Sequence, residues 1–183
     1  MQLKEIYQLI KKELISVEEI LEKSIKGTRN KSILEISDYL LGAKGKRLRP
    51  ALVILSAKAS QQPSPINERS MVSIAAAMEL IHMASLIHDD CLDHACLRHN
   101  KPTINSKYGQ DASIVLGDYL YSIGFELISS CRNPDILSCI ASATKAMCEG
   151  ELIQVCERDN LDLLKKRYII IAKKKTASLF VAS

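Results

Sequence analysis

The sequence of 183 residues contains no tryptophan, and aromatic residues make up only 4% of it. Proteins that stack nucleic-acid bases need aromatic platforms, so this scarcity argues against a nucleic-acid partner. The net charge of +4 is modest, and the basic residues are not gathered into one long tail. The charge therefore suits small anionic ligands and does not by itself indicate nucleic acid.

The sequence also lacks the features of a secreted or membrane-inserted protein. No Cys-x-x-Cys pair occurs among the six cysteines, which mostly lie in apolar helical patterns, so we expect reduced thiols and no disulfide framework. The N-terminal stretch "MQLKEIYQLIKKELISVEEI" is amphipathic and charged, unlike a signal peptide or a membrane span. We therefore predict a cytoplasmic protein without a transmembrane segment.

Strand signals and internal repeats are absent as well, and almost every segment has helical periodicity. Helices are predicted over about residues 3–24, 32–42, 51–60, 65–94, 110–130, 134–157 and 161–182. Ser64 is the predicted N-cap of the long helix, with Pro65 at its first position. The centre of this helix, residues 71–88, is apolar on nearly all sides and should be buried. The predicted fold class is all-α, one domain of antiparallel helices around this central helix.

Three aspartates, Asp89, Asp90 and Asp93, follow the apolar run in the segment "HDDCLDHACLRHNKP". At about 100° per residue, Asp89 and Asp93 share one helical stripe with His82, and Asp90 is offset but adjacent. Carboxylates this close repel each other unless a cation lies among them. Oxygen ligands suit Mg²⁺, whose coordination is usually completed by substrate phosphates. The cluster therefore predicts a Mg²⁺ site for a phosphorylated substrate.

Other interpretations of this segment remain open. It could be a solvated acidic helix end, although a helix C-terminus disfavours negative charge. The pattern "HDD" is only a weak signal for an HD-type phosphohydrolase, which needs further His and Asp ligands on other helices. A zinc site is a third possibility, although its ligands would face different sides of the helix. Its candidate ligands are His82, His88, His94 and His99 with Cys91 or Cys96.

A basic turn, "KGKRLRP", precedes the helix predicted from residue 51. Lysine supplies a point charge, arginine a planar fork, and a helix N-terminus supplies backbone N–H groups, which together suit a diphosphate. The alternative is a solvated basic loop. The candidate ligands in this turn are Lys44, Lys46, Arg47 and Arg49.

Together these segments resemble the head-to-tail trans-prenyltransferases, the isoprenyl diphosphate synthases, over roughly residues 35–183. "KGKRLRP" is similar to the family's GGKRxRP motif, and "LIHMASLIHDDCLDHACLRHNKPTIN" to its first aspartate-rich region, DDxxD followed by LRRGxPT. "GDYL", "GELIQ" and "KKTASLF" follow in the family's order and spacing. Each motif alone is weak, but five in order are specific. The resemblance implies a helical bundle of the isoprenoid synthase type.

The resemblance also implies a Mg²⁺-dependent trans-polyprenyl diphosphate synthase. Such an enzyme adds isopentenyl diphosphate to an allylic diphosphate such as farnesyl diphosphate. By this resemblance, isopentenyl diphosphate would be bound by Lys46, Arg49 and His82, and Mg²⁺ by Asp89, Asp90 and Asp93. The allylic diphosphate would be bound by Arg98, Lys175 and Thr176, and Gln154 would lie near the reacting carbons.

The sequence departs from the family pattern at three points. Lys44 replaces the first glycine of the basic motif, and His99 replaces the second arginine of the LRR pair, where it would be a conditional, shorter cation for the substrate. The family's second aspartate-rich motif does not occur before Ser183. We therefore expect either the N-terminal part of such an enzyme or a truncated, non-catalytic diphosphate-binding subunit or paralogue. Because the family is commonly dimeric, a homo-oligomer or a partner subunit is expected.

Two small residues, Ala84 and Ser85, lie about one helical turn before Asp89. Short-chain members of the family carry a bulky floor near this position, so small side chains favour an open tunnel. The resemblance then implies a medium- or long-chain product of the quinone side-chain type. Close packing of two helices would also favour alanine and serine, and this alternative stays open.

Overall fold

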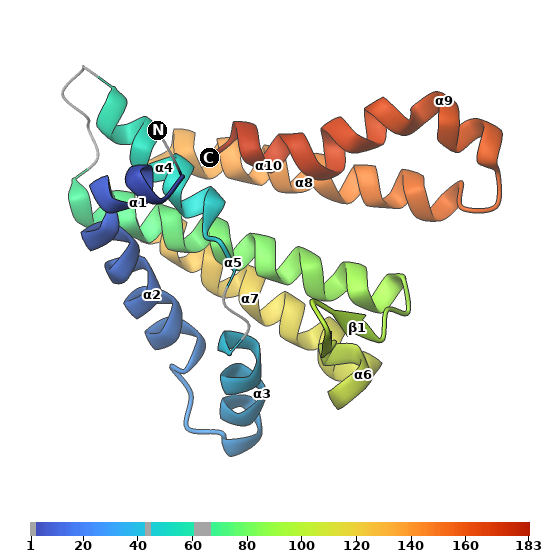
Figure 1. The fold of residues 1–183 in the computed structure, drawn as a ribbon, viewed down its shortest axis with the longest axis horizontal. Coiled ribbons are helices and arrows are strands. Elements are labelled where there is room, and N and C mark those ends of the chain that lie inside the picture. Colours follow the sequence, from blue (N-terminus) through green and yellow to red (C-terminus); the bar gives the residue numbers. More distant parts are fainter. Residues whose placement is uncertain (1–2, 43–44, 61–66) are drawn as a thin grey trace. The chain divides into compact units, whose positions relative to one another are not determined.

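The computed structural model describes residues 3–42, 45–60 and 67–183, and most of them are helical (Figure 1). The prediction of an all-α fold class is confirmed. The chain divides into two compact units: unit 1 extends to Cys131, and unit 2 covers Arg132–Ser183. Each unit has its own helical packing, and the expectation of a single domain stays a prediction.

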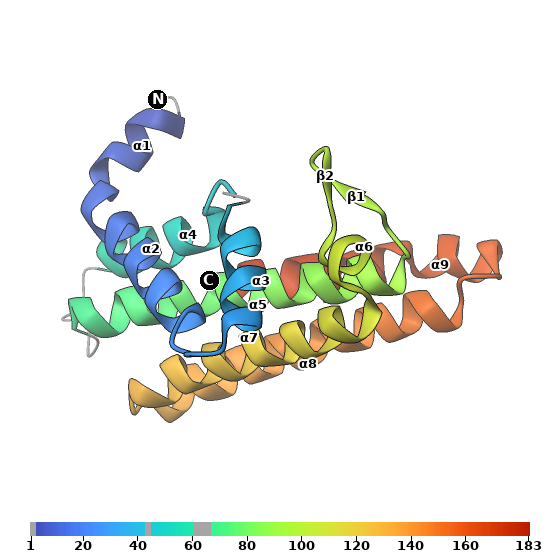
Figure 2. The same cartoon turned by 90° about the horizontal axis from the view of Figure 1, so that it is seen from below.

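Unit 1 is built around α5 (Glu68–Leu92), which packs most extensively against α7 (Gln110–Ser130). The two helices run side by side in both views (Figures 1 and 2), and α4 and α2 also pack on α5. The remaining elements of unit 1 are α1 (Leu3–Leu9), α2 (Lys11–Ile25), α3 (Lys31–Leu41), α4 (Leu48–Ala59), β1 (Leu97–Arg98), β2 (Lys101–Pro102) and α6 (Ile104–Tyr108).

The central helix is buried as its sequence predicted. Met78, Leu80 and Ile81 are fully buried, and between residues 71 and 84 only two side chains, at 73 and 82, are even partly exposed. By length and composition α5 could cross a membrane, but 72% of its most apolar window is buried inside the protein. The central helix of a protein core can have the same length and composition, because a helix that is apolar all round occurs in protein cores as well as in membranes.

The long helix begins later than the sequence predicted. It starts at Glu68, and its N-cap is Asn67, whose side-chain oxygen accepts a 2.8 Å hydrogen bond from the amide of Ser70. The predicted cap, Ser64, and Pro65 lie outside the described residues. An asparagine at this position satisfies one of the amides that a helix N-terminus leaves unpaired.

Helical periodicity also missed two local features of unit 1. The helix predicted over residues 3–24 is interrupted at the buried residue Ile10, between α1 and α2. The segment between the helices predicted over residues 65–94 and 110–130, for which no helix or strand was predicted, forms the β1–β2 hairpin and the short helix α6. His99 (φ 50°) and Asn100 (φ 61°) occupy the hairpin turn, and two positive φ values are typical of a type I′ turn. Strands of two residues are too short to produce an alternating pattern.

Unit 2 consists of α8 (Pro134–Cys156), α9 (Leu161–Ala172), the π-helical turn η1 (Lys173–Ala177) and α10 (Ser178–Val181). Asn133 caps α8, with Pro134 at its first position as predicted. The helix predicted over residues 161–182 is interrupted by η1, which packs closely on α8. A side chain at Gly150 would place its Cβ 2.8 Å from the amide nitrogen of Lys175, so this approach requires glycine.

Candidate active site

The three aspartates lie at the C-terminal end of α5, which has Asp93 as its C-cap. The amide of Asp93 donates a 2.8 Å hydrogen bond to the carbonyl of Asp89. These two residues are therefore one helical turn apart, as the sequence predicted. Asp89 is half-buried and Asp93 is exposed, whereas Asp90 is buried. The cluster thus contains two accessible carboxylates and one shielded carboxylate.

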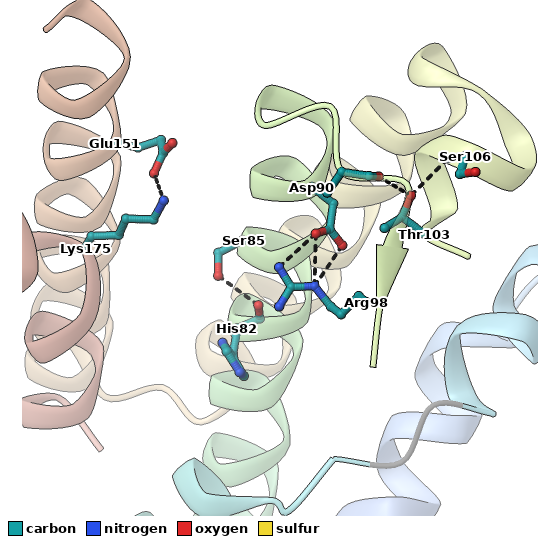
Figure 3. A network of polar contacts seen from close by, with 9 residues as sticks. His82, Ser85, Asp90, Arg98, Thr103, Ser106, Glu151 and Lys175 are labelled. Carbon is teal, nitrogen blue, oxygen red and sulfur yellow. Dashed lines mark hydrogen bonds and ion pairs between the residues drawn. The ribbon is translucent and has the colours of Figure 1, made fainter. Parts of the chain in front are cut away.

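The shielded carboxylate, Asp90, is held by Arg98 (Figure 3). The Nε of Arg98 donates to both carboxylate oxygens at 3.0 and 2.9 Å, and its Nη2 donates to Oδ1 at 2.8 Å. This pairing raises the pKa of Arg98, first through the hydrogen bonds with Asp90 and further through the charges of Asp89 and Asp93. The predicted Mg²⁺ ligand Asp90 and the predicted diphosphate ligand Arg98 therefore neutralise each other in this structure.

The hairpin that carries Arg98 is fixed to the end of α5 by local hydrogen bonds. The amide of Ala95 donates to the carbonyl of Asp90 at 2.9 Å, and the hydroxyl of Thr103 donates to the carbonyl of Ala95 at 2.7 Å. The same hydroxyl caps α6 by accepting from the amide of Ser106 at 3.1 Å (Figure 3). Arg98 is therefore held on β1, and the exposed residue His99 lies at the tip of the hairpin.

His82 lies on the same helix, two turns before Asp89. Burial lowers its pKa to about 3, assisted by the positive charges of Arg49, Arg98 and Arg47. The basic turn therefore lies close enough to His82 for its charges to act on the ring, and their binding of one diphosphate stays a prediction. His82 is consequently neutral at physiological pH and can donate a hydrogen bond from one ring nitrogen without adding charge. Ser85 donates a 2.8 Å hydrogen bond to the carbonyl of His82 (Figure 3).

Among the four cations predicted in the basic turn, Arg47 has protein partners that the sequence did not predict, and its contact with a diphosphate stays a prediction. Its side chain is buried and pairs with two carboxylates, 2.5 Å from Nε to Glu18 and 2.8 Å from Nη1 to Glu79. Its guanidinium is therefore neutralised by carboxylates of the protein. Lys46 is exposed. Burial lowers the pKa of Arg49, and the negative charge of Glu79 offsets part of this decrease. Lys44 lies outside the described residues.

Glu18 and Glu79 were not among the predicted site residues. A signal for Glu79 was present in the sequence, because it is the single acid within the apolar stretch "AAAMELI". A buried carboxylate needs a charged or hydrogen-bonding partner, so this acid could have been used to predict a buried cation near the centre of α5. Nothing comparable marks Glu18, which lies among other acids on the amphipathic helix α2.

His88, which precedes the aspartates, faces the neighbouring helix α7. Its Nε2 lies 3.0 Å from the carbonyl of Ile114 and 3.6 Å from a carboxylate oxygen of Asp118. The ring occupies the space beside Gly117 of the "GDYL" motif, where an added Cβ would lie 2.1 Å from Nε2. This contact provides a packing role for the glycine of that motif.

The remaining predicted ligands belong to unit 2. Lys175 on η1 forms an ion pair with Glu151 of α8, and both side chains are largely shielded, with 21% and 13% exposed (Figure 3). Thr176 is exposed and Gln154 is half-buried. The sequence did not predict Glu151 as the partner of Lys175. Since these residues and the aspartates lie in different units, their convergence on one ligand stays a prediction.

The donor groups differ in how well they suit zinc and magnesium. Across the described ranges, no three His, Cys, Asp or Glu side chains form a group that could hold a metal ion. Neither the zinc alternative nor a metal site formed by all three aspartates therefore gains support from the arrangement of the described residues. For Mg²⁺, Asp89 and Asp93 offer hard oxygen donors one turn apart, and oxygens of a bound substrate would have to complete the site.

The two small residues near the aspartates have different surroundings. Ala84 is fully buried, which favours the close-packing alternative at that position. Ser85 is half-buried. Of the two residues, Ser85 is therefore the better candidate to line an open tunnel.

Comparison with known proteins gives a consistent result. The sequence profile of the family described as Polyprenyl synthetase matches residues 30–183. Heptaprenyl diphosphate synthase component 2 from Geobacillus stearothermophilus is 36% identical over 183 residues, which are 100% of this chain and 56% of that protein. Octaprenyl diphosphate synthase from Escherichia coli (strain K12) is 32% identical over 151 residues, 82% of this chain and 46% of that protein. The chain spans about half the length of the curated relatives it matches.

A similar fold occurs in a solved structure. The crystal structure of a polyprenyl synthase from Caulobacter crescentus CB15, complexed with calcium and isoprenyl diphosphate, matches with a TM-score of 0.91 and 29% sequence identity. The match covers 99% of this chain and 54% of that one. The helical bundle predicted from the motifs is therefore the fold that the chain adopts.

Proposed function

Because the chain belongs to the polyprenyl synthetase family, we propose that it functions in a trans-polyprenyl diphosphate synthase that makes a medium- or long-chain product. Such an enzyme joins isopentenyl diphosphate to an allylic diphosphate such as farnesyl diphosphate. One observation carries the proposal: α5 presents Asp89 and Asp93 one turn apart, two turns after a neutral His82 that is coupled to Arg49. The names of the heptaprenyl and octaprenyl relatives support the product class.

The carboxylates fit a Mg²⁺ cofactor that a diphosphate helps to bind. Asp89 and Asp93, with Asp90, would hold the ion, which when bound supplies positive charge to stabilise the departing diphosphate. The polyprenyl synthase from C. crescentus was crystallised in complex with both calcium and an isoprenyl diphosphate, which supports this combination in the fold.

The chain's own residues have separable tasks in this proposal. Lys46 and Arg49 hold the diphosphate of isopentenyl diphosphate, and neutral His82 donates a hydrogen bond to it. Arg98, Lys175 and Thr176 stabilise the negative charge that develops on the allylic diphosphate as its C–O bond breaks, and Gln154 lies near the reacting carbons. His99 contributes a further cation to the allylic diphosphate when it is protonated. The double bond of isopentenyl diphosphate then attacks the allylic carbon, and the departing diphosphate accepts the proton that is lost.

A second candidate function is a diphosphate-binding subunit that needs a partner chain. The name "component 2" of the G. stearothermophilus relative favours it. In either case we propose a cytoplasmic protein that associates with a second copy or a partner subunit. All six cysteines are free thiols, which supports a reducing compartment.

The experiment measures binding and turnover on a polypeptide of residues 1–183. Calorimetry with Mg²⁺ and farnesyl diphosphate, and separately with isopentenyl diphosphate, should show saturable binding of both. Extraction of prenyl products from labelled isopentenyl diphosphate should show no steady turnover by this polypeptide, because carboxylates of a second aspartate-rich motif are not among its residues. Absence of binding for either diphosphate would overturn the proposal. Steady turnover would show that the second motif is dispensable.

A further inference from the structure

The basic turn is fixed by side chains from three helices that are distant in sequence. Glu18 of α2 accepts from Nε and Nη2 of Arg47 at 2.5 and 3.2 Å, and Glu79 of α5 accepts from Nη1 at 2.8 Å. The hydroxyl of Tyr7 on α1 donates to the backbone carbonyl of Lys46 at 2.7 Å. We call Tyr7, Glu18, Arg47 and Glu79 the Arg47 clamp.

The clamp residues form one electrostatic group. Burial by itself lowers the pKa of Arg47, but its hydrogen bonds and charge interactions with Glu18 and Glu79 outweigh burial and leave the pKa raised. Burial also raises the pKa of Tyr7, and the charge of Glu79 adds to this increase. Arg47 is therefore charged and Tyr7 is protonated, so each hydrogen bond of the clamp has its donor in place at physiological pH.

The backbone of the turn needs such support. Arg47 has a φ of 52° in the left-handed region, which is unfavourable for a residue with a side chain, and it immediately precedes α4. Charge-assisted hydrogen bonds from two helices hold the side chain, so they also hold this backbone conformation. Since Arg47 follows Lys46 directly and Arg49 lies two positions on, the clamp fixes the backbone that carries both proposed substrate ligands.

The position of the clamp in the sequence has a consequence for α1 and α2. Tyr7 and Glu18 lie before residue 30, where the match to the family profile begins. The break at Ile10 separates the two residues into different helices, and both reach the same turn. The N-terminal helices therefore contribute directly to the shape of the basic turn.

We propose that the Arg47 clamp is the positioning device of the isopentenyl diphosphate site. Its residues act through Lys46 and Arg49 and do not touch the substrate themselves. This inference rests on the proposed function, because it names the diphosphate that the basic turn holds. It predicts that changes on α1 and α2 weaken binding of isopentenyl diphosphate and leave binding of the allylic diphosphate at the aspartates unchanged.

The test uses two conservative variants of the chain, each with a matched control. Tyr7→Phe deletes only a hydroxyl, and its control is Tyr168→Phe, a tyrosine that is 67% exposed on α9. Glu18→Gln removes one charge, and its control is Glu19→Gln at the exposed neighbouring position. Amide hydrogen exchange over residues 45–49 reports on the turn. Calorimetry gives the Kd of isopentenyl diphosphate and, separately, of farnesyl diphosphate with Mg²⁺.

We expect faster exchange in the turn for both clamp variants. The Kd of isopentenyl diphosphate should rise about tenfold for Glu18→Gln, which loses a charge-assisted pair, and about threefold for Tyr7→Phe, which loses one neutral hydrogen bond. The Kd of farnesyl diphosphate should not change, and both controls should match the unaltered chain.

Two results would overturn the inference: unchanged exchange in the turn, or an equal loss of affinity for both diphosphates, which indicates general destabilisation. If the unaltered chain binds no isopentenyl diphosphate, the proposed function fails. The exchange measurement then decides by itself whether the clamp holds the turn. Failure of the clamp and failure of the function are thus separate results.

Discussion

The acidic end of α5 and the basic turn before α4 are held in place in different ways. At the acidic end, Arg98 binds Asp90 across eight residues of sequence. At the basic turn, Arg47 binds Glu18 across 29 residues and Glu79 across 32. The first arrangement needs only one helix end and a hairpin, whereas the second needs α2, α4 and α5 to be packed together. Two sites of opposite charge in the same unit therefore depend on the fold to different degrees.

Solvent access separates the two regions further. Arg98 has 39% of its side chain exposed, so part of its charge is hydrated. Arg47 is only 9% exposed, and Glu79 only 5%. A charge that keeps contact with water tolerates the loss of its partner, but a buried charge does not. The comparison therefore predicts that the basic turn is the more sensitive region for stability, and the acidic end the more sensitive one for metal-dependent binding.

The largest effect should come from the accessible carboxylates. Asp89→Ala or Asp93→Ala removes one hard oxygen ligand and should lower Mg²⁺-dependent affinity for farnesyl diphosphate about a hundredfold or more. Calorimetric titration measures this, with Asp159→Ala at an exposed turn as the control. Affinity for isopentenyl diphosphate should stay the same. Unaltered affinity for farnesyl diphosphate in either variant would rule out the metal assignment.

The next effect compares the two ion pairs directly through stability. Glu79→Ala leaves buried Arg47 with one carboxylate fewer and should lower the free energy of unfolding by about 3 kcal/mol. Asp90→Ala should cost about 1 kcal/mol, because Arg98 can turn into solvent. Urea unfolding followed by circular dichroism measures both. Glu22→Ala, which breaks the exposed pair with Lys26, is the control for a surface salt bridge. Equal losses for Glu79→Ala and Asp90→Ala would remove the distinction between the two regions.

A smaller effect tests how strongly the acidic end of α5 depends on packing against the neighbouring helix α7. Gly117→Ala on α7 places a methyl group 2.1 Å from the Nε2 of His88, so the ring must move. Such overpacking should cost about 1–2 kcal/mol of unfolding free energy. Adding His88→Ala should recover most of this loss, since the two sites are in contact and couple. A loss that the double variant does not recover would point to a clash elsewhere on α7.

The smallest effect at neutral pH concerns His82, and it grows as the pH falls. Its pKa is about 3 in the folded protein, below the ordinary value of 6.5 that the unfolded chain has. Between these pH values the unfolded state binds more protons, so stability is full above about pH 6.5 and falls as the pH drops towards 3. His82→Gln should flatten this part of the stability profile, measured as urea midpoints from pH 7 to pH 4. An unchanged slope would mean that His82 is not buried near Arg49.

The predictions that succeeded concern geometry that neighbours in the chain decide. The apolar run of residues 71–88 predicted a buried central helix, and a spacing of four residues predicted that Asp89 and Asp93 lie one turn apart. The order of the five motifs predicted the family and the fold. Each of these rests on helical period or on short-range pattern, which the sequence displays directly.

The partners that sequence reasoning did not predict have the opposite cause. Arg47 has the composition of a phosphate ligand, but its role depends on Glu18 and Glu79, which no local pattern connects to it. Lys175 likewise pairs with Glu151 across the packing of η1 on α8, where Gly150 permits the close approach. The sequence by itself determined the buried central helix, the acidic stripe and the family. Only the tertiary structure decided which charged side chains face inward, because the cost of burying a charge is offset only by partners that the packing of distant helices brings together.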